Sequence, residues 1–493
     1  MSDSTAHLPP GLSEAAADLL ADHSLPGRWV RRWRERAPWP QLRASDGRWI
    51  SSEELEERTR VAASRLLGSG LSPGDRIVLS AASSVELVVA YVAALRAGLV
   101  VLPLNPAYTE AEVRRIVRDA APAAAAVDDD ERREWISDAA EGSIQLHGIE
   151  LALPDAGAAG EIDGARSEDP ALLVYTSGTT GRPKGALLTH GNLLASATAV
   201  NLAWRWEPDD CLLLTLPLFH VHGLGVGLNG SLCAGAAVSL RPKFELEDVV
   251  AQVAAGTSLF FGVPAMYQRL AAAGQLAAFK PLRLIVSGSA PLPSSLAKEI
   301  ADQSGQVPLE RYGMTETIML TSNPYDGERR PGTVGFPLPG VQLRLGDLNE
   351  VEVTGPNVIA GYYRNPEADA ESFADDGWFR TGDLGEFDGD GYLRLIGRSK
   401  ELIITGGFNV YPREVEEVLL AHRAVVEVAV IGRPSEQWGE EVTAVVVASG
   451  AVEEQDLREH AASRLAPYKV PKRVEFIDEL PRNALGKVVR GEL

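Results

Sequence analysis

The chain has 493 residues and a formal net charge of −21, with 45% hydrophobic and 23% charged residues. This negative charge argues against nucleic acid and anionic membrane as general partners, and a bound polyphosphate would need local cationic or backbone donors. The two cysteines form no C-x-x-C pair, so we expect a reducing compartment, the cytoplasm, and no disulfide framework. The acidic N-terminal segment lacks the apolar core of a signal peptide.

The first elements predict an α/β protein. The early run PGRWVRRWRERAPW places Trp29 and Trp33 one helical turn apart, which indicates an amphipathic helix that buries both tryptophans. Residues 74–122 then alternate between β-branched runs and helical runs, the pattern of a layered, largely parallel sheet. Residues 121–170 are rich in Ala, Asp and Gly and predict surface connections around one or two strands.

One apolar stretch, VELVVAYVAALRAGLVVLPL from Val85, has nearly the length of a membrane span. Glu86 and Arg96 interrupt it, and Gly98 breaks it. These positions favour a buried helix, a glycine stop and a strand.

The end of the chain predicts a separate small domain. ELIITGGFNVY indicates a hairpin, and PREVEEVLLAH indicates a helix with Pro412 near its start. Two β-branched strands, a helix and a last strand follow. We therefore expect a first domain over residues 1–397 and a second over residues 398–493.

A phosphate-binding loop is indicated by YTSGTTGRPKG, which follows the apolar strand ALLVY. Glycines let backbone N–H groups converge on an anion, hydroxyl groups add donors, and a lysine adds a mobile positive charge. The spacing is not that of a Walker A loop. The candidate residues are Thr176, Ser177, Gly178, Thr179, Thr180, Gly181 and Lys184.

This loop resembles the signature loop of the adenylate-forming superfamily, which includes acyl-CoA synthetases, adenylation domains and luciferases. Companion motifs follow in the order of that superfamily: SGSAPL, ERYGMTET, WFRTGDLGEFDGDGYLRLIGRSKELI and PRNALGKVVR. The resemblance covers nearly the whole chain. It implies an α/β fold with a large N-terminal adenylate-forming domain of layered sheets and helices plus a small mobile α+β C-terminal domain.

The resemblance also implies an acid–CoA ligase that uses ATP, Mg²⁺ and CoA. At the ATP site it places Ser289, Ala290, Glu310, Arg311, Tyr312, Gly313 and Met314 around adenine, Thr315 at the α-phosphate, Glu316 with Thr176 at Mg²⁺, and Asp383 with Arg398 at the ribose. A carboxylate is a hard oxygen ligand that suits Mg²⁺, and an ionised Asp accepts hydrogen bonds from two hydroxyl groups.

Four residues of the second domain complete the implied machinery. Lys487 reaches the substrate carboxylate and the α-phosphate during adenylation, while Lys400 is the hinge about which the domain rotates. Gly406 and Gly407 then approach the pantetheine of CoA, where small residues permit close passage.

Two segments that are expected to line the acid pocket resemble those of malonyl-CoA synthetases. They are PLFHVHGL and SNPYDG, the second of which follows ERYGMTET. The candidate residues for the acid are His220, Arg283, Ser287, Gly288 and Met319. A second carboxylate needs a cation in the pocket, and Arg283 is the candidate.

Two further positions pull the choice of acid in opposite directions. Ser289 favours malonate, whereas Leu320 leaves room for methylmalonate or a short fatty acid.

Several alternatives stay open or are disfavoured. A short- or medium-chain fatty acyl-CoA synthetase, or a stand-alone adenylation enzyme that loads a carrier protein, would share most of these motifs. The G-x-G-x-x-G at Gly225, Gly227 and Gly230 could indicate a dinucleotide site, but HVHGL separates it from the preceding strand, so a helix of small residues is expected. His220 and His222 lack further metal ligands nearby, and the role of His222 is open.

Overall fold

The computed structural model describes residues 4–13, 17–152, 161–176, 184–435, 437–482 and 488–493. The chain forms two compact units, the first with residues 1–343 and 353–379 and the second with residues 344–352 and 380–493. A large α/β unit and a smaller α+β unit confirm the predicted fold class. The predicted domain boundary between residues 397 and 398 was placed beside an expected hinge at Lys400, and it stays a prediction.

A six-stranded sheet collects the apolar runs of the first third of the chain, in the order β6-β5-β3-β4-β7-β8. Its neighbours pair in parallel, except for the antiparallel pair β7–β8. The strands are β3 (Arg76–Ser80), β4 (Val100–Pro103), β5 (Ala124–Val127), β6 (Gln145–Gly148), β7 (Pro170–Thr176) and β8 (Lys184–Thr189).

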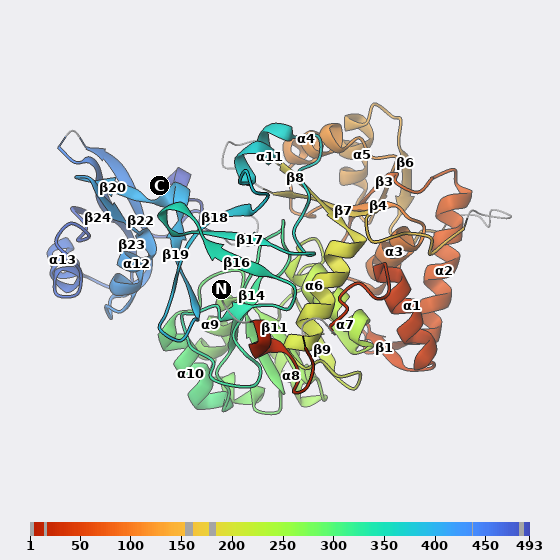
Figure 1. Ribbon diagram of the computed structural model, residues 1–493, viewed down its shortest axis with the longest axis horizontal. Helices are drawn as coiled ribbons and strands as arrows, with labels where there is room; N and C mark the ends of the chain where they lie inside the picture. Colours follow the sequence, from red (N-terminus) through yellow and green to blue (C-terminus); the bar gives the residue numbers. More distant parts are fainter. Residues whose placement is uncertain (1–3, 14–16, 153–160, 177–183, 436, 483–487) are drawn as a thin grey trace. The chain divides into compact units, whose positions relative to one another are not determined.

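The predicted buried helix and glycine stop are confirmed. Every residue of helix α3 (Val85–Arg96) except Glu86 is buried, and Gly98 follows the helix with φ +74° before β4 begins. The segment predicted as surface connections contains β5 and β6, and it also contains helix α5 (Asp130–Ala139) between them. Figure 1 shows α4 (Glu110–Ala120) and α5 together beside these strands.

A nine-stranded sheet forms the centre of the first unit, in the order β15-β14-β13-β12-β11-β9-β10-β1-β2. Strands β1, β10, β9, β11, β12 and β13 run parallel, and antiparallel strands flank them at both edges. The strands are β1 (Pro40–Arg43), β2 (Trp49–Ser51), β9 (Cys211–Leu214), β10 (Ala237–Leu240), β11 (Leu259–Gly262), β12 (Leu284–Ser287), β13 (Leu309–Tyr312), β14 (Thr321–Ser322) and β15 (Phe336–Pro337). The loops that leave β9, β11, β12 and β13 therefore meet at one edge, where open α/β sheets bind ligands.

The first unit contains further helical segments besides α3, α4 and α5. They are η1 (Ser4–His7), α1 (Leu25–Glu35), α2 (Ser52–Gly68), α6 (His190–Ala203), η3 (His222–Leu228), α7 (Asn229–Ala234), α8 (Leu246–Ala254), α9 (Pro264–Ala272), η4 (Leu276–Phe279), α10 (Ser294–Ser304) and α11 (Pro366–Ser372). Trp29 and Trp33 of α1 are 0% and 1% exposed, so the predicted amphipathic helix is confirmed. Within the described residues, no helix combines the length and apolar character needed to cross a membrane.

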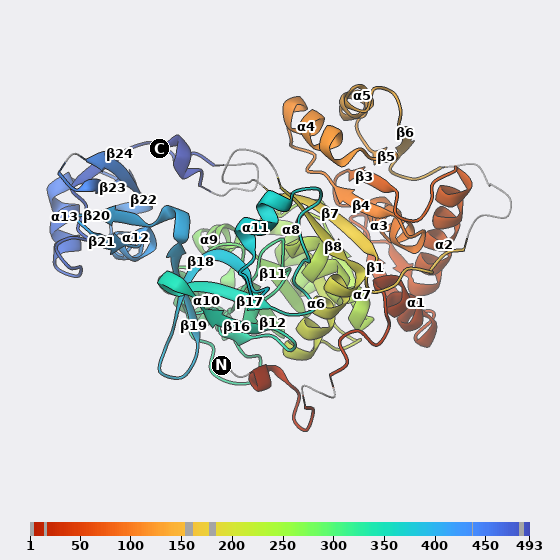
Figure 2. The same ribbon diagram turned by 45° about the horizontal axis from the view of Figure 1, so that its top comes forward.

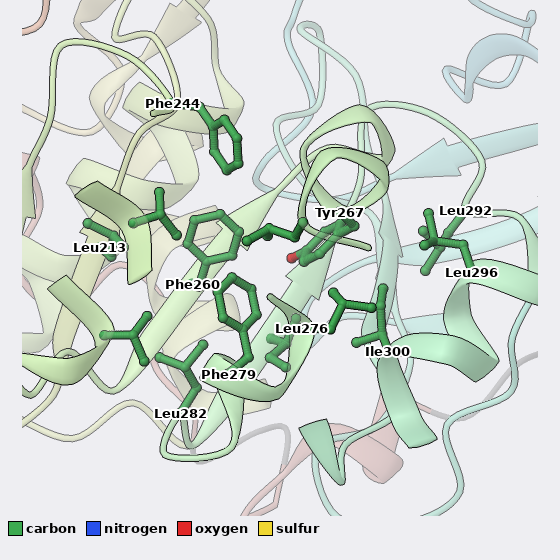
Figure 3. Packing of buried hydrophobic residues seen from close by; sticks show 14 of the residues in the cluster. Leu213, Phe244, Phe260, Tyr267, Leu276, Phe279, Leu282, Leu292, Leu296 and Ile300 are labelled. Carbon is green, nitrogen blue, oxygen red and sulfur yellow. The ribbon is translucent and has the colours of Figure 1, made fainter. Parts of the chain in front are cut away.

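An aromatic core lies between the nine-stranded sheet and helices α8, α9 and α10 (Figure 3). The ring of Phe260 on β11 lies 5.8 Å from that of Tyr267 on α9 and 5.0 Å from that of Phe279, centroid to centroid. Full burial of one such side chain stabilises the fold by about 1.5–3 kcal/mol. This packing anchors strands β9, β11 and β12 to helices α8, α9 and α10.

The second unit contains most of a four-stranded sheet and all of a five-stranded sheet. Their strands are β16 (Gln342–Leu345), β17 (Glu350–Thr354), β18 (Phe379–Phe387), β19 (Leu393–Arg398), β20 (Ile403–Thr405), β21 (Phe408–Val410), β22 (Val425–Ser435), β23 (Gly439–Ala448) and β24 (Arg473–Phe476). The helical segments are η5 (Asp347–Asn349), η6 (Ser399–Glu401), α12 (Pro412–Leu420), α13 (Glu454–Ala462) and η7 (Arg490–Glu492). Figures 1 and 2 show α12 and α13 beside the five-stranded sheet, and the predicted hairpin is β20–β21.

Candidate functional site

The base of the predicted phosphate loop is formed by two paired strands. Thr176 ends β7 and lies directly opposite Lys184, the first residue of β8. The Lys184 ammonium lies 3.2 Å from a carboxylate oxygen of Glu371 and 5.4 Å from the centroid of the Tyr362 ring. The loop residues Ser177, Gly178, Thr179, Thr180 and Gly181 lie outside the described residues.

A tight turn follows β13 and carries the second group of predicted ATP residues. The carbonyl oxygen of Met314 accepts hydrogen bonds from the backbone N–H groups of Thr317 and Ile318, at 3.1 and 2.7 Å. At Gly313 a Cβ atom would lie 2.3 Å from the carbonyl oxygen of Ile318, so only glycine fits there. The turn leaves Thr315 partly exposed.

The predicted metal ligand Glu316 is held firmly within this turn. Its carboxylate is buried, and its Oε1 accepts a hydrogen bond from the hydroxyl group of Tyr362 at 2.9 Å. A buried carboxylate with one oxygen already oriented by a hydrogen bond fits a hard divalent cation such as Mg²⁺.

The loop after β12 provides the predicted adenine-side residues. Ser287 is the last residue of β12, Gly288 follows it, and Ser289 adopts the left-handed region with φ +68°. Ser289 and Ala290 are both exposed. Strand β13, which pairs with β12, carries Glu310, and Oε1 of Glu310 accepts a hydrogen bond from the backbone N–H of Gly332 at 2.8 Å.

A buried arginine lies over this loop. Arg311 of β13 is 6% exposed, and a Cβ atom on Gly288 would lie 2.3 Å from its Cζ and Nε atoms. Among the described residues its Nε and Nη2 atoms have no hydrogen-bond partner. Burial lowers the pKa of Arg311 to about 9, which leaves the guanidinium charged at neutral pH. A buried charge in this state is stabilised by an anion.

Two histidines lie near this guanidinium. Nδ1 of His222 lies 3.1 Å from the hydroxyl oxygen of Ser289, and Nδ1 of His220 accepts the backbone N–H of His222 at 3.2 Å. Burial lowers the pKa of His220 to about 4, with the Arg311 charge as a second cause. Burial and the same charge lower the pKa of His222 well below its ordinary value. Both rings are therefore neutral at neutral pH and can donate or accept a hydrogen bond.

The helix that begins at His222 has an unusual geometry. Residues His222–Leu228 form a π-helix, η3, which continues into α7. A Cβ atom on Gly223 would lie 2.3 Å from the carbonyl oxygen of Pro217, and one on Gly227 would lie 2.9 Å from Leu214. The G-x-G-x-x-G pattern is thus a packed helix of small residues, as the sequence predicted, and π-helical turns often occur at functional sites.

Arg283, predicted to clamp a second carboxylate, lies elsewhere. It precedes β12, at the opposite end of that strand from Ser287. Its Nε donates to one carboxylate oxygen of Asp210 at 3.0 Å and its Nη2 to the other at 2.5 Å, and its Nη1 donates to the carbonyl oxygen of Trp204 at 3.2 Å. Because its charge is already neutralised and its position is remote from the loop edge, we withdraw Arg283 as the clamp and consider Arg311 in its place.

Two other acid-pocket positions are buried in the core. Met319 and Leu320 are both 0% exposed. The carbonyl oxygen of Met319 accepts a hydrogen bond from the Asn357 side chain at 2.8 Å. Met319 is therefore a fully buried residue whose backbone is held by Asn357.

The predicted ribose residues meet within the second unit. Asp383 on β18 pairs with Arg398 on β19, and Nε of Arg398 lies 3.0 Å from Oδ1 of Asp383. Lys400 lies in η6, directly after β19.

The turn of the predicted pantetheine segment also forms within the second unit. Gly406 and Gly407 make the β20–β21 turn with φ +56° and +82°. The ring of Trp438 covers Gly406, where a Cβ atom would lie 3.0 Å from it. Lys487 lies outside the described residues.

Comparisons with known proteins agree with this architecture. The AMP-binding enzyme family model matches residues 29–363, and the model of the AMP-binding enzyme C-terminal domain matches residues 414–487. The chain is 36% identical to a feruloyl-CoA synthase of Amycolatopsis over 95% of this chain and 98% of that protein. It is 34% identical to a malonate–CoA ligase of Arabidopsis thaliana over 86% of this chain and 78% of that protein.

A solved structure is similar over almost the whole chain. The crystal structure of ATP-bound MatB from Rhodopseudomonas palustris has a TM-score of 0.88 and 39% identity, and the match covers 95% of this chain and 98% of that one. Fold, motifs and comparisons define an AMP-forming CoA ligase. The chain belongs to the AMP-binding enzyme family, in the adenylate-forming superfamily, near its malonyl-CoA synthetases.

Sequence reasoning missed two features of this site. It placed Arg311 with the nucleotide, which stays a prediction, and did not foresee that this guanidinium is buried without a hydrogen-bond partner for Nε and Nη2 among the described residues; a charged residue within the buried strand LERY is the signal for this. It did not single out Tyr362, whose only signal is its place in the polar, aromatic run GYYRNP.

Proposed function

We propose that the protein joins a short dicarboxylic acid, malonate or methylmalonate, to CoA with consumption of ATP. The observation that carries this proposal is the buried Arg311 guanidinium, whose Nε and Nη2 atoms have no hydrogen-bond partner among the described residues. Within the described part of the chain, Oγ of Ser287 and Nε2 of His222 also have no hydrogen-bond partner. These groups form a polar, cationic end for the acid pocket.

In this proposal the distal carboxylate of the acid pairs with Arg311. A bidentate arginine–carboxylate pair fixes orientation and offsets the cost of burying both charges. The neutral ring of His222 adds a hydrogen-bond donor or acceptor beside it, and His220 contacts the reacting carboxylate. A fatty acid would leave Arg311 buried without an anion, which disfavours fatty acyl chains at this site.

The reacting carboxylate is then adenylated. Its oxygen attacks the α-phosphorus of ATP, a P–O bond forms, and the bond to pyrophosphate breaks. Because this step brings an anion to a polyanion, positioning and charge neutralisation supply most of the catalysis. Lys184 and Lys487 supply positive charge, Thr315 donates to the α-phosphate, and the phosphate loop contributes its backbone N–H groups.

Further residues hold the nucleotide. Glu316 and Thr176 are the residues that would hold Mg²⁺, which neutralises phosphate charge when bound. Asp383 and Arg398 bind the ribose, while Tyr312, with Ser289 and Ala290, borders the adenine.

The CoA thiol finally attacks the acyl carbonyl carbon, a C–S bond forms, and AMP leaves with its phosphate oxygen. Lys400 acts as the hinge between the two steps, and Gly406 and Gly407 line the approach of pantetheine. The first domain, residues 1–397, then keeps the adenylate while the second moves.

A substrate panel tests this assignment. Malonate, methylmalonate, butyrate, octanoate and ferulate are compared for CoA-dependent formation of AMP, with kcat/KM as the readout. We expect malonate or methylmalonate to exceed octanoate at least tenfold, which equals about 1.4 kcal/mol of transition-state binding.

The other outcomes separate the remaining possibilities. A tenfold preference for octanoate or ferulate would refute the dicarboxylic acid and keep the ligase. AMP formation that requires a phosphopantetheinyl carrier protein in place of CoA would identify a carrier-loading enzyme. No AMP formation with any acid would refute the ligase itself.

A further inference from the structure

Tyr362 contacts two charged residues of the proposed ATP site, Glu316 and Lys184. It is 8% exposed, its hydroxyl group donates to Oε1 of Glu316 at 2.9 Å, and its ring lies 5.4 Å from the ammonium of Lys184. A single side chain thus links the proposed metal ligand to the lysine at the end of the phosphate loop. Lys184 is the first residue of β8, and Glu316 lies in the turn after β13, so the two come from different sheets.

The loop that carries Tyr362 is fixed to the same turn by its backbone. The Asn357 side chain donates to the carbonyl oxygens of Thr317 and Met319, both at 2.8 Å. The backbone N–H of Ile359 donates to the carbonyl oxygen of Glu316 at 3.0 Å. Hydrogen bonds from the segment 357–362 therefore hold the turn after β13 in place.

The far side of Tyr362 is fixed as well. Its backbone N–H donates to Oδ1 of Asp369 in α11 at 2.7 Å. A Cβ atom on the preceding Gly361 would lie 2.9 Å from a carboxylate oxygen of the same aspartate, so the loop packs closely on α11. Tyr362 is therefore held at its backbone by Asp369 and at its hydroxyl group by Glu316.

The hydrogen bond determines what the carboxylate can do. The hydrogen bond from the phenol to Oε1 restrains rotation of the Glu316 carboxylate and so limits the directions from which this group can meet a cation. Because an ionised carboxylate can only accept hydrogen bonds, the phenol O–H is the donor in this pair. Hydrogen bonds to a ligating carboxylate orient it, and their loss typically weakens metal binding or activity about 10- to 100-fold.

We propose that Tyr362 is a positioning residue that orients Glu316 toward the Mg²⁺ of bound Mg·ATP and aligns Lys184 with the phosphates. This inference rests on the proposed function, because it presupposes an ATP site. The proposal assigns separate roles to the hydroxyl group and to the aromatic ring of Tyr362. The hydroxyl group acts on the metal ligand, and the ring acts on the lysine.

The test compares Tyr362→Phe with Tyr363→Phe. The neighbouring Tyr363 is a matched control, because its buried hydroxyl group has no hydrogen-bond partner among the described residues. ATP binding is measured by calorimetry at a series of free Mg²⁺ concentrations, without acid or CoA. We expect the half-saturating Mg²⁺ concentration to rise about tenfold in Tyr362→Phe and to stay unchanged in Tyr363→Phe.

Tyr362→Leu removes the ring as well. It should show the same shift in Mg²⁺ dependence and, in addition, weaker ATP binding at saturating Mg²⁺, which Tyr362→Phe should not show. An unchanged Mg²⁺ dependence in Tyr362→Phe would overturn the inference. So would ATP binding that is weakened equally at every Mg²⁺ concentration, since that is the mark of a merely structural tyrosine. Failure of the wild-type protein to bind Mg·ATP would instead overturn the proposed function.

Discussion

At the scale of single residues, the surroundings of two arginines decide which one can serve a substrate. Arg283 donates to both oxygens of Asp210, a residue 73 positions earlier, whereas Arg311 has no comparable carboxylate partner among the described residues. Arg283 directly precedes the apolar strand β12 and Arg311 lies within β13, and neither position shows in the sequence which arginine has a carboxylate partner. The pairing with Asp210 is a long-range contact that sequence patterns do not encode.

The two arginines should therefore respond differently to substitution by methionine. We expect Arg311→Met to lower kcat/KM for malonate at least a hundredfold and that for butyrate less than about threefold. The physical reason is that the removal of one partner of a buried charge pair costs about 2–5 kcal/mol. Steady-state kinetics on both acids measures this ratio.

Arg283→Met is the comparison. It leaves Asp210, which is 4% exposed, as a buried unpaired charge, so the melting temperature should fall while the malonate-to-butyrate ratio stays constant. Equal effects of Arg311→Met on both acids would remove Arg311 from the acid pocket.

At the scale of elements, local patterns predicted most of the fold. Helix α3 with its stop at Gly98, the β20–β21 hairpin and helix α12 with Pro412 near its start all formed as expected. Strand β5 was harder, because its sequence AAAV has little intrinsic β preference, and its fully buried position between β3 and β6 decides its structure. The π-helical geometry of η3 has no sequence signal that periodicity could reveal.

The close approach of two adjacent strands gives a prediction at this scale. A methyl group on Gly288, after β12, would overlap the Arg311 guanidinium on β13, at 2.3 Å from Cζ. Gly288→Ala should therefore displace the guanidinium and lower kcat/KM for malonate at least tenfold, with little change for butyrate. Steady-state kinetics on both acids, with the melting temperature in parallel, measures this.

Gly389→Ala is the matched control, since a Cβ atom there meets no atom within 4 Å and its φ is not in the left-handed region. A Gly288→Ala protein with wild-type malonate kinetics would show that the guanidinium is not held where the acid binds.

At the scale of the whole molecule, ordered motifs carried more information than any element. They predicted a large first domain and a small second one, and the family models match along both. Motifs of the second unit, with Asp383, Arg398 and Lys400, are far in sequence from the phosphate loop, and only the resemblance indicated that they act on one nucleotide. The acid was less predictable, since the proposed choice of acid depends on the long-range surroundings of one buried side chain, Arg311.

The proposed alternation of the second domain leads to a prediction about Lys487. Under this proposal Lys487 serves adenylation alone, because the rotation proposed for thioester formation would carry it away. Lys487→Ala should lower malonate-dependent pyrophosphate exchange at least a hundredfold, while thioester formation from supplied malonyl-adenylate and CoA keeps much of its rate. Both half-reactions are measured separately on the same preparation.

Lys243→Ala, at an exposed lysine paired with Glu245, controls for the loss of one positive charge and should change neither half-reaction. Equal loss of both half-reactions in Lys487→Ala would contradict domain alternation, since a lysine needed in both steps could not leave the active site between them.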